Sequence, residues 1–399
     1  MVRAPVRMLA SEFMDALGLQ DMVRARFGEY LAALEEMVNI DCGSYTRVGV
    51  NDVADLCERR FVDAGWDVER RAHEPAAGEV HLGDLVVGRL RGSGAKSVLL
   101  IGHMDTVFDE GTVADRPFRV DRDRALGPGV SDMKGGLLAG FFATAALQES
   151  GFDDFATITY VCNPDEEVGS PFSKPVIAEL ATEHDMAFVL EGARENGDIV
   201  SARKGITDYE LIIHGRAAHA GVEPDRGRNA VLEAAHQVIA LQALNGRWPG
   251  VTVNVGVVQG GTRSNVVAAM CRLHVDLRAP GLDALEEAEA EVERICAETS
   301  VPGTSVEVIA HGWHRPMEKG AAAQRLVDVA TATASELGFT ISDAATGGAS
   351  DANTTSAAGT PTIDGLGPIG GDDHAPAEWL DLTSVVPRIT LLAGLIARA

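Results

Sequence analysis

The sequence predicts an α/β protein in which one domain interrupts another. Short apolar runs typical of buried strands alternate with amphipathic segments in the first half of the chain, and this pattern resumes near the carboxyl end. Between the two parts, strand and helix patterns follow the order βαββαβ, which is typical of a ferredoxin-like unit. A chain of 399 residues is long enough for two domains and a sizeable core.

The interrupted domain is expected to begin with helices. Apolar side chains three to five residues apart predict a helix over Asp21–Ile40. An amphipathic pattern predicts a second helix over Asn51–Ala64, ended by Gly65. The strands expected next are Trp66–Arg71, Leu82–Leu90 and Ser97–Gly102.

Turn-forming segments separate the later elements of this domain. A charged loop is expected over Asp109–Arg124, followed by a glycine-rich loop, G-P-G-V-S-D-M-K-G-G. A helix of small residues is expected over Gly136–Gln148, and the strand Phe155–Cys162 then runs into N-P-D-E-E-V-G-S. A further strand, Ala187–Leu190, ends at Glu191.

The inserted domain is expected over residues 205–316, which leaves residues 1–204 and 317–399 for the interrupted one. The expected elements of the insertion are strand Thr207–His214, helix Asn229–Asn245, strands Val251–Gln259 and Met270–Arg278, helix Leu282–Glu298 and strand Ser305–His311. The elements expected after it are helices Ala321–Leu337 and Asp351–Ala358, strand Thr360–Leu366 and helix Leu382–Ala399.

Composition limits the partners and the compartment. A net charge of −25 argues against nucleic acids and anionic membranes, and no apolar run approaches the ~20 residues of a membrane span. The amino-terminal segment lacks the apolar core of a signal peptide. The cysteines are scattered, without C-x-x-C spacing, which indicates reduced thiols: Cys42, Cys57, Cys162, Cys271 and Cys296. We therefore expect a cytoplasmic protein.

Residues that can bind metals follow the predicted strands. His103 and Asp105 come directly after Ser97–Gly102, and their spacing places them on one face of an extended segment. By itself, this pattern also fits a solvated pair in a loop. Further such residues lie at strand ends or in glycine-containing loops: Asp132, Glu166, Glu167, Glu191 and His374. Because open α/β sheets bind ligands beyond the carboxyl ends of their strands, we expect these side chains to meet.

This set of side chains suits a pair of metal ions. Zinc binds imidazole nitrogens and carboxylate oxygens, and two imidazoles with three carboxylates could hold two ions if one carboxylate bridges them. Paired metals activate a water molecule and polarise a scissile carbonyl. Glu166 and Glu167 suggest a division of labour, in which one binds metal and its neighbour acts as a general base.

The motifs resemble those of the dizinc hydrolase family that includes glutamate carboxypeptidase, aminoacylase, acetylornithine deacetylase and succinyl-diaminopimelate desuccinylase. The resemblance spans nearly the whole chain, in family order, and is closest to the glutamate carboxypeptidase-like branch. The matching motifs are G-H-M-D-T-V-F (Gly102–Phe108), G-P-G-V-S-D-M-K-G-G (Gly127–Gly136), N-P-D-E-E-V-G-S (Asn163–Ser170) and D-D-H-A-P (Asp372–Pro376). It implies a zinc-peptidase-like, three-layer catalytic domain with a mixed central sheet, interrupted by a lid and dimerisation domain.

The resemblance also implies roles for the metal-binding residues. His103, Asp132 and Glu191 would hold one Zn²⁺. Asp132, Glu167 and His374 would hold the other, so that Asp132 bridges two zinc ions per subunit. Cobalt or manganese could substitute, because the same ligand types accept them.

The residues around these ligands have implied roles as well. Asp105 would orient His103, and Glu166 would be the general base that activates a metal-bridging water. The resemblance further implies a cis peptide bond between Asp132 and Met133.

The inserted domain carries the implied substrate contacts. His219, in H-G-R-A-A-H-A-G, resembles a histidine that reaches the active site of the neighbouring subunit and stabilises an oxyanion. Arg278 would bind the substrate α-carboxylate, with Asn265 beside the carboxylate or the oxyanion. The remaining implied contacts are Arg315 and the backbone of Gly347 and Gly348.

The expected activity is hydrolysis of the C-terminal amide bond of N-acyl amino acids or small peptides, with a glutamate-like leaving group. Alternatives are an N-acyl-amino-acid deacylase and a catalytically silent binding protein. The chain has H-A-P where some glutamate carboxypeptidases have H-S-D, and Met133 where a second aspartate is common. Both positions lie outside the ligand set, so they affect the choice of substrate rather than the chemistry.

Overall fold

The computed structural model describes residues 16–399, apart from the side chain of Trp313. The expectation about the amino-terminal segment lies outside these residues. The chain forms two compact units. The first unit contains the residues up to Ser201, Lys319–Ala344 and Thr354–Ala399, and the second contains Ala202–Glu318 and Ala345–Asn353. The sequence boundaries leave residues 345–353 in the interrupted domain, whereas in the structure the Asn353 amide donates to the carbonyls of Lys204 (3.1 Å) and Arg315 (2.7 Å).

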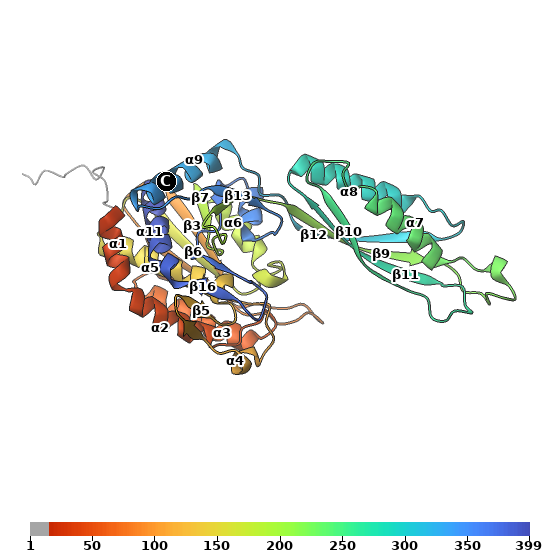
Figure 1. Ribbon diagram of the computed structural model, residues 1–399, viewed down its shortest axis with the longest axis horizontal. Helices are drawn as coiled ribbons and strands as arrows, with labels where there is room; N and C mark the ends of the chain where they lie inside the picture. Colours follow the sequence, from red (N-terminus) through yellow and green to blue (C-terminus); the bar gives the residue numbers. More distant parts are fainter. Residues whose placement is uncertain (1–15) are drawn as a thin grey trace, which may run out of the picture. The chain divides into compact units, whose positions relative to one another are not determined.

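The first unit is built on a six-stranded mixed sheet with the order β1-β2-β6-β3-β7-β14. Its strands β3, β6 and β7 are labelled in Figure 1. β1 and β2 pair antiparallel with their neighbours, whereas β6, β3, β7 and β14 run parallel. The bounds are β1 Asp67–Arg71, β2 Leu85–Arg91, β3 Ser97–His103, β6 Thr157–Asn163, β7 Met186–Val189 and β14 Thr362–Ile363. The mixed central sheet is therefore confirmed.

Helices cover both faces of this sheet. Phe61 of α3 and Phe141 of α5 both contact the ring of Tyr160 in β6, at 5.7 and 5.0 Å between centroids. The next residue in the strand, Thr159, points to the other face, where its hydroxyl lies 2.8 Å from His184, just after α6. These contacts make the unit three-layered. The main helices are α1 Ala16–Ala25, α2 Phe27–Val38, α3 Arg47–Asp63, α5 Gly135–Glu149, α6 Lys174–Thr182, α9 Ala321–Glu336, α10 Asp351–Ala357 and α11 Leu382–Arg398.

Some elements of the first unit differ from the sequence prediction. The single helix expected over Asp21–Ile40 is two helices, α1 and α2, which separate at Arg26 (φ −99°, ψ 5°). The charged loop contains α4 (Thr112–Asp115), whose amino end is held by Asp41: its carboxylate accepts the amides of Gly111 and Val113, both at 2.8 Å.

Short strands near the glycine loop were also missing from the prediction. They form a small sheet in the order β15-β16-β5-β4, with bounds β4 Arg119–Asp121, β5 Arg124–Leu126, β15 Gly370–Gly371 and β16 Trp379–Asp381. A further pair joins β8 (Ile199–Arg203) to β13 (Asp343–Thr346). These strands are only two to five residues long, and β5 pairs with β16, and β8 with β13, across large sequence distances, so local periodicity does not reveal them.

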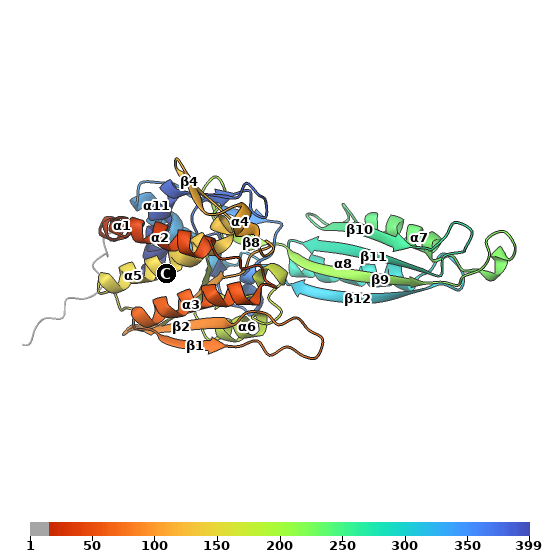
Figure 2. The same ribbon diagram turned by 90° about the horizontal axis from the view of Figure 1, so that it is seen from below.

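The second unit has the predicted ferredoxin-like architecture. Its four strands form an antiparallel sheet in the order β10-β11-β9-β12, and α7 and α8 pack on it (Figure 2). The bounds are β9 Gly205–His214, α7 Ala230–Gln242, β10 Thr252–Gly260, β11 Met270–Ala279, α8 Leu282–Ala297 and β12 Ser305–His314. Alternate residues of β9 and β11 are buried beneath the helices, as strand geometry requires.

The five cysteines are free and buried. Among the helices of residues 16–399, none combines the length and apolar character that crossing a bilayer requires.

Candidate metal centre

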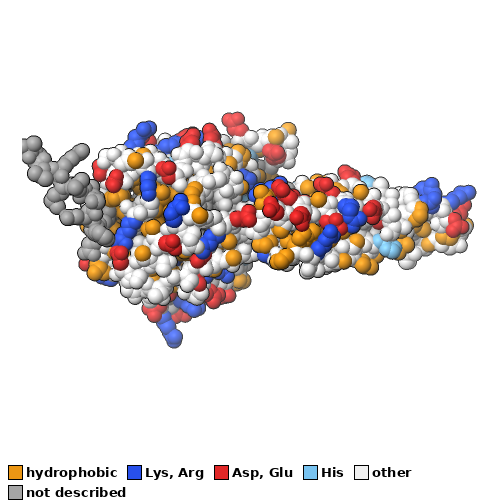
Figure 3. All heavy atoms as spheres, turned by 90° about the horizontal axis from the view of Figure 1, so that it is seen from above, with side chains coloured by type: hydrophobic (Ala, Val, Ile, Leu, Met, Phe, Trp, Pro, Cys, Tyr) orange, Lys and Arg blue, Asp and Glu red, His pale blue; other side chains and the backbone are white. Residues whose placement is uncertain are grey.

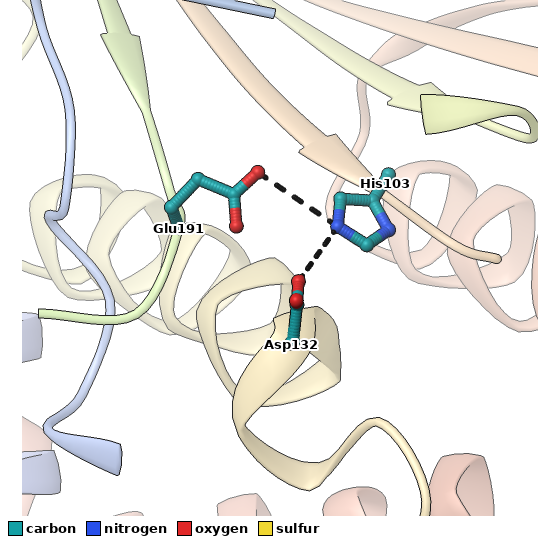
Figure 4. Close-up of side chains that lie close together, drawn as sticks. All are labelled: His103, Asp132 and Glu191. Carbon is teal, nitrogen blue, oxygen red and sulfur yellow. Dashed lines mark hydrogen bonds and ion pairs between the residues drawn. The ribbon is translucent and has the colours of Figure 1, made fainter. Parts of the chain in front are cut away.

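Two groups of side chains in the first unit present nitrogen and oxygen atoms within 4.8 Å of one another. The first group is His103, Asp132 and Glu191; the second is Asp132, Glu167 and His374. Both groups consist of residues that the sequence singled out, and Asp132 belongs to both. In Figure 4 the side chains of the first group converge from three separate segments. The structure thus brings five residues from five separate strand ends and loops into one place.

His103 is the buried member at the end of β3, with a relative exposure of 1%. Its Nε2 lies 3.1 Å from Asp132 Oδ1 and 3.8 Å from Glu191 Oε1. Its Nδ1 lies 3.0 Å from the Asp105 carbonyl oxygen and 3.4 Å from Asp105 Oδ1. A proton on Nδ1, donated to Asp105, leaves the Nε2 lone pair facing the carboxylates, which is the tautomer a metal ligand needs.

His374 faces the opposite oxygen of Asp132. Its Nε2 lies 3.0 Å from Asp132 Oδ2 and 3.2 Å from Glu167 Oε2. These two carboxylates raise the pKa of His374 to about 11. Asp132 therefore uses one oxygen toward each imidazole, as a bridging ligand would.

The charges at this centre fit a bound cation. Burial raises the pKa of Glu167, because the charged carboxylate loses water. Its Oε1 atom is buried and has no hydrogen-bond partner among residues 16–399. An unpaired buried carboxylate oxygen is costly unless a cation compensates it. Two imidazoles and three carboxylates are a ligand set typical of zinc, which binds such atoms at ~2.0–2.2 Å.

Asp105 ties the end of β3 to the Glu166–Glu167 turn. Its carboxylate accepts the Ser44 hydroxyl at 2.6 Å and the backbone amides of Glu166 and Glu167 at 3.1 and 3.2 Å. The same fully buried residue contacts His103 Nδ1 through its backbone carbonyl at 3.0 Å and its Oδ1 at 3.4 Å. One residue therefore orients an imidazole and holds the turn that carries both glutamates. The turn is a short 3₁₀ segment, Glu166–Val168, ended by Gly169 at φ +86°.

The glycine loop that carries Asp132 has a buried anchor that the sequence did not indicate. Glu378 accepts the backbone amides of Gly129 (2.8 Å), Ser131 (2.8 Å) and Asp132 (3.0 Å). Burial raises the pKa of Glu378 to about 7, although the three amides oppose the shift. A lone glutamate after D-D-H-A-P carries no spacing signal of its own, so only the folded chain reveals this contact. The peptide bond after Asp132 is cis.

The proposed lid residues His219 and Asn265 lie in adjacent segments of the second unit. His219 forms an isolated antiparallel bridge with Val266, and the amide of Ala220 donates to the Asn265 carbonyl at 3.0 Å. His219 Nδ1 accepts the Gly221 amide at 3.2 Å. Within the described part of the chain its Nε2 has no hydrogen-bond partner, so it can still donate to a ligand.

Arg278 is held on both sides. Its Nε and Nη2 each lie 3.0 Å from an oxygen of Asp276, and Nη1 donates to the Gly347 carbonyl at 2.8 Å. The predicted substrate residues Arg278 and Gly347 therefore touch. Asp276 stands two residues earlier on the same strand face, a neighbour that strand alternation could have revealed.

Arg315 and Gly348 have different neighbours. Arg315 Nη1 lies 3.2 Å from Glu289 of α8, and the Gly348 carbonyl accepts Arg203 Nη1 at 3.2 Å. The structure does not bring Arg315 to Arg278 through any contact among the described residues. Arg278 and Arg315 each form an ion pair with an acidic side chain. A substrate carboxylate would have to share the guanidinium with that side chain.

The chain is similar in sequence to a known protein family and to individual enzymes. Residues 99–398 match the family described as peptidase family M20/M25/M40. Carboxypeptidase G2 of Pseudomonas sp. (strain RS-16) is 32% identical over 369 residues, which cover 92% of this chain and 88% of that protein. An acetylornithine deacetylase of Proteus mirabilis (strain HI4320) is 32% identical over 210 residues, 48% of this chain and 52% of that protein.

Solved structures share the fold. The aminopeptidase PepT from Bacillus cereus ATCC 10987 aligns with a TM-score of 0.76 at 24% identity, and the alignment covers 95% of this chain and 98% of that one.

Proposed function

Because the chain belongs to the peptidase family M20/M25/M40, we propose that it releases the C-terminal residue of N-acyl amino acids or small peptides. As a member of this metallopeptidase family the chain is a hydrolase, and a dinuclear metal site is typical of the family. The observation that carries the proposal is the position of Asp132, with one oxygen toward His103 and the other toward His374.

The proposal assigns two metal ions to the two ligand groups, with Zn²⁺ as the expected metal and Co²⁺ or Mn²⁺ as substitutes. His103, Asp132 and Glu191 would hold one ion, and Asp132, Glu167 and His374 the other. Bound there, the ions would make a water molecule more acidic and polarise the scissile carbonyl. The unpaired Oε1 of Glu167 supports this assignment.

Glu166 is the proposed general base. Its carboxyl group would take a proton from the attacking water and pass it to the leaving amine nitrogen. The bond from its backbone amide to Asp105 fixes the start of the turn, so the side chain works from an anchored backbone. Asp105 itself would keep His103 in the required tautomer.

The proposed substrate contacts come from the second unit. Arg278 would bind the α-carboxylate of the leaving amino acid, and Asn265 would add an amide donor. Asp276 and Gly347 hold the guanidinium in one orientation, which supports a role that depends on geometry as well as charge. Arg315 and the backbone of Gly347 and Gly348 are proposed as further contacts, and His219 as the donor to the oxyanion.

A homodimer formed through the second unit completes the proposal. β10 is an edge strand, and its residues Val257 and Val258 are exposed. On α7, Val231, Leu232 and Ile239 are exposed, the last to 70%. Figure 3 shows hydrophobic side chains on the surface of this unit among charged ones. An unpaired strand edge beside apolar side chains is a surface suited to a second copy.

We also propose a cytoplasmic location, because the five thiols are free, as in proteins of reducing compartments.

One other activity has support of its own. The match to an acetylornithine deacetylase favours an N-acyl-amino-acid deacylase as the second possibility. The two activities differ in the side of the amide that must be recognised: the carboxypeptidase selects the leaving amino acid, whereas the deacylase selects the acyl group.

The test is a substrate panel with metal content measured alongside. N-acyl-glutamates, N-acyl-aspartates, neutral N-acyl amino acids, dipeptides and N-acetyl-ornithine are compared by release of free amino acid. Preference for a glutamate or aspartate leaving group, with about two metals per chain, supports the proposal. Rates that follow the acyl group would assign the chain to the deacylases, and absence of hydrolysis from a metal-loaded protein would contradict both.

A further inference from the structure

Glu378 is neither a proposed metal ligand nor a proposed reacting group. It is nevertheless among the most buried acids of the chain, with a relative exposure of 1%. Its Oε1 accepts the amides of Ser131 and Asp132, and its Oε2 accepts the amide of Gly129. A carboxylate that accepts three backbone donors fixes the path of the chain that supplies them. Here the donors belong to the glycine loop that carries Asp132, the residue common to both ligand groups.

The anchor also joins two loops that are far apart in sequence. Glu378 lies in the segment that follows His374, and its own amide donates to the Ala375 carbonyl at 3.2 Å. One side chain therefore ties the His374 loop to the Asp132 loop. The two loops also meet through their ligands, since His374 Nε2 lies 3.0 Å from Asp132 Oδ2.

The Asp132 loop needs an anchor because little else in it is regular. Gly129 has φ +74°, and a Cβ at that position would lie 2.5 Å from Thr106 Cγ2. Asp132 and Met133 have non-helical dihedral angles (φ −113° and −130°) between the loop and α5. The donors at Gly129, Ser131 and Asp132 would otherwise be buried without an acceptor, which is costly.

We propose that Glu378 is a positioning residue for the metal centre: it holds the Asp132 loop against the His374 loop so that Asp132 can bridge two metal ions. This inference rests on the proposed metal-dependent function. Glu378 would act through the backbone and would not touch metal or substrate. Residues that orient metal ligands in this way change metal affinity by about 10- to 100-fold when they are altered.

Glu378→Gln is the informative variant. An amide has one carbonyl oxygen and one NH₂ group, so at least one of the three backbone donors must face another donor. The volume and the apolar contacts stay nearly the same. Glu378→Asp keeps both oxygens but withdraws them by one methylene, and we expect it to recover part of the function that the Gln variant loses.

Glu233 offers a matched control in the second unit. It is also fully buried, and its Oε2 accepts the backbone amides of Ser300 (2.8 Å) and Val301 (2.7 Å). Glu233→Gln removes the same kind of anchor from a different loop, so any general cost of replacing a buried carboxylate appears in both variants.

The first measurement is a Co²⁺ titration of the metal-free protein, followed by the visible absorption of the bound ion. Glu378→Gln should bind Co²⁺ about 10- to 100-fold more weakly than the wild type, with an altered spectrum, while Glu233→Gln keeps the wild-type affinity. Equal affinity in Glu378→Gln and the wild type would overturn the inference. No Co²⁺ binding by the wild type would instead contradict the proposed function.

The second measurement does not depend on metal, and its wild-type part does not depend on the folding of a variant. Amide hydrogen exchange of the metal-free wild type should show protection of Ser131 and Asp132, because Glu378 accepts their protons. In Glu378→Gln, exchange at these amides should accelerate while the core of α5 is unchanged. Exchange of these amides in the wild type at the rate of an unstructured loop would reject the anchor.

Discussion

His374 Nε2 lies 3.0 Å from Asp132 Oδ2, although 242 residues separate the two positions in the chain. The inserted unit and several elements of the sheet lie between them in sequence. The pair therefore forms only when the carboxyl-terminal part of the first unit has packed on the amino-terminal part. A metal ion held by both residues would join these two parts of the fold.

Metal removal should consequently lower both activity and stability. A ligand that binds only the folded state stabilises it by about 2.7 kcal/mol when its free concentration is 100 times its Kd. We expect a chelator to abolish hydrolysis and lower the melting temperature, and added Zn²⁺ to restore both. Added Zn²⁺ should raise the melting temperature of His374→Ala less than that of the wild type. In His311→Ala, a variant of the second unit, the rise should equal that of the wild type. Equal melting temperatures with and without metal would contradict this expectation.

Loss of the proposed base should separate metal binding from turnover. Glu166→Ala leaves both ligand groups intact, so metal content should stay at the wild-type level. Turnover should fall by about 10²–10⁴-fold, the usual contribution of a general base. Glu149→Ala, at the exposed end of α5, is the control and should be fully active. Near-normal turnover of a metal-loaded Glu166→Ala variant would assign the base elsewhere.

The sequence predicted those parts of the fold that local patterns encode. Apolar runs such as Val98–Ile101 are strands because a buried strand needs apolar side chains on both faces. The convergence of His103, Asp132 and Glu191 followed from their places at strand ends and in a glycine loop. The break at Arg26 left the apolar period intact, so periodicity alone could not detect it.

Other features depend on contacts that no local pattern contains. Glu378 receives its role from three amides some 250 residues away, and the short strands β15 and β16 from pairing in a small sheet that includes β5. The pairing of Arg278 with Gly347 likewise joins distant segments. In each case the contact that gives the residue its role forms only when the chain folds.

Arg278 should determine recognition of the substrate carboxylate. Hydrogen bonds to charged groups contribute about 1.5–3 kcal/mol, so Arg278→Ala should lower kcat/KM by about 10- to 100-fold, mainly through KM. For substrates whose α-carboxylate is amidated, the Arg278→Ala change should lower kcat/KM only slightly. Arg278→Lys should not restore activity, because Lys lacks the planar fork that Asp276 and Gly347 orient. The control is Arg272→Ala. Arg272 lies on the same face of β11 as Arg278, and its guanidinium pairs with Glu210 of β9. An equal loss of kcat/KM in this control would indicate a general charge effect.

The second unit should contain a carboxylate that destabilises it at neutral pH. Burial, together with Asp276 on the neighbouring strand, raises the pKa of Asp208 above its ordinary value. Between the unfolded and the folded pKa the folded state binds more protons, so stability falls as the pH rises through that window. Asp208→Asn removes this loss, so its melting temperature should exceed that of the wild type at pH 7.5.

The gain should shrink as the pH falls toward the ordinary pKa of an aspartate, where Asp208 is protonated in both states. The exposed Asp225→Asn should shift the melting temperature equally at both ends of the pH range. A gain in Asp208→Asn that does not change with pH would mean that packing, rather than the charge of Asp208, limits stability at this site.

Mixing two inactive variants tests the proposed exchange of His219 between subunits. If His219 serves the active site of the neighbouring subunit, a mixed dimer of His219→Ala and Glu166→Ala chains has one site with both defects and one site with neither. Statistical exchange should then produce partial activity from two inactive preparations, while each variant alone stays inactive. Subunit exchange is followed separately by energy transfer between labelled chains, so that exchange without recovered activity would place His219 at the site of its own subunit. A chain that remains monomeric would reject both the dimer and the shared histidine.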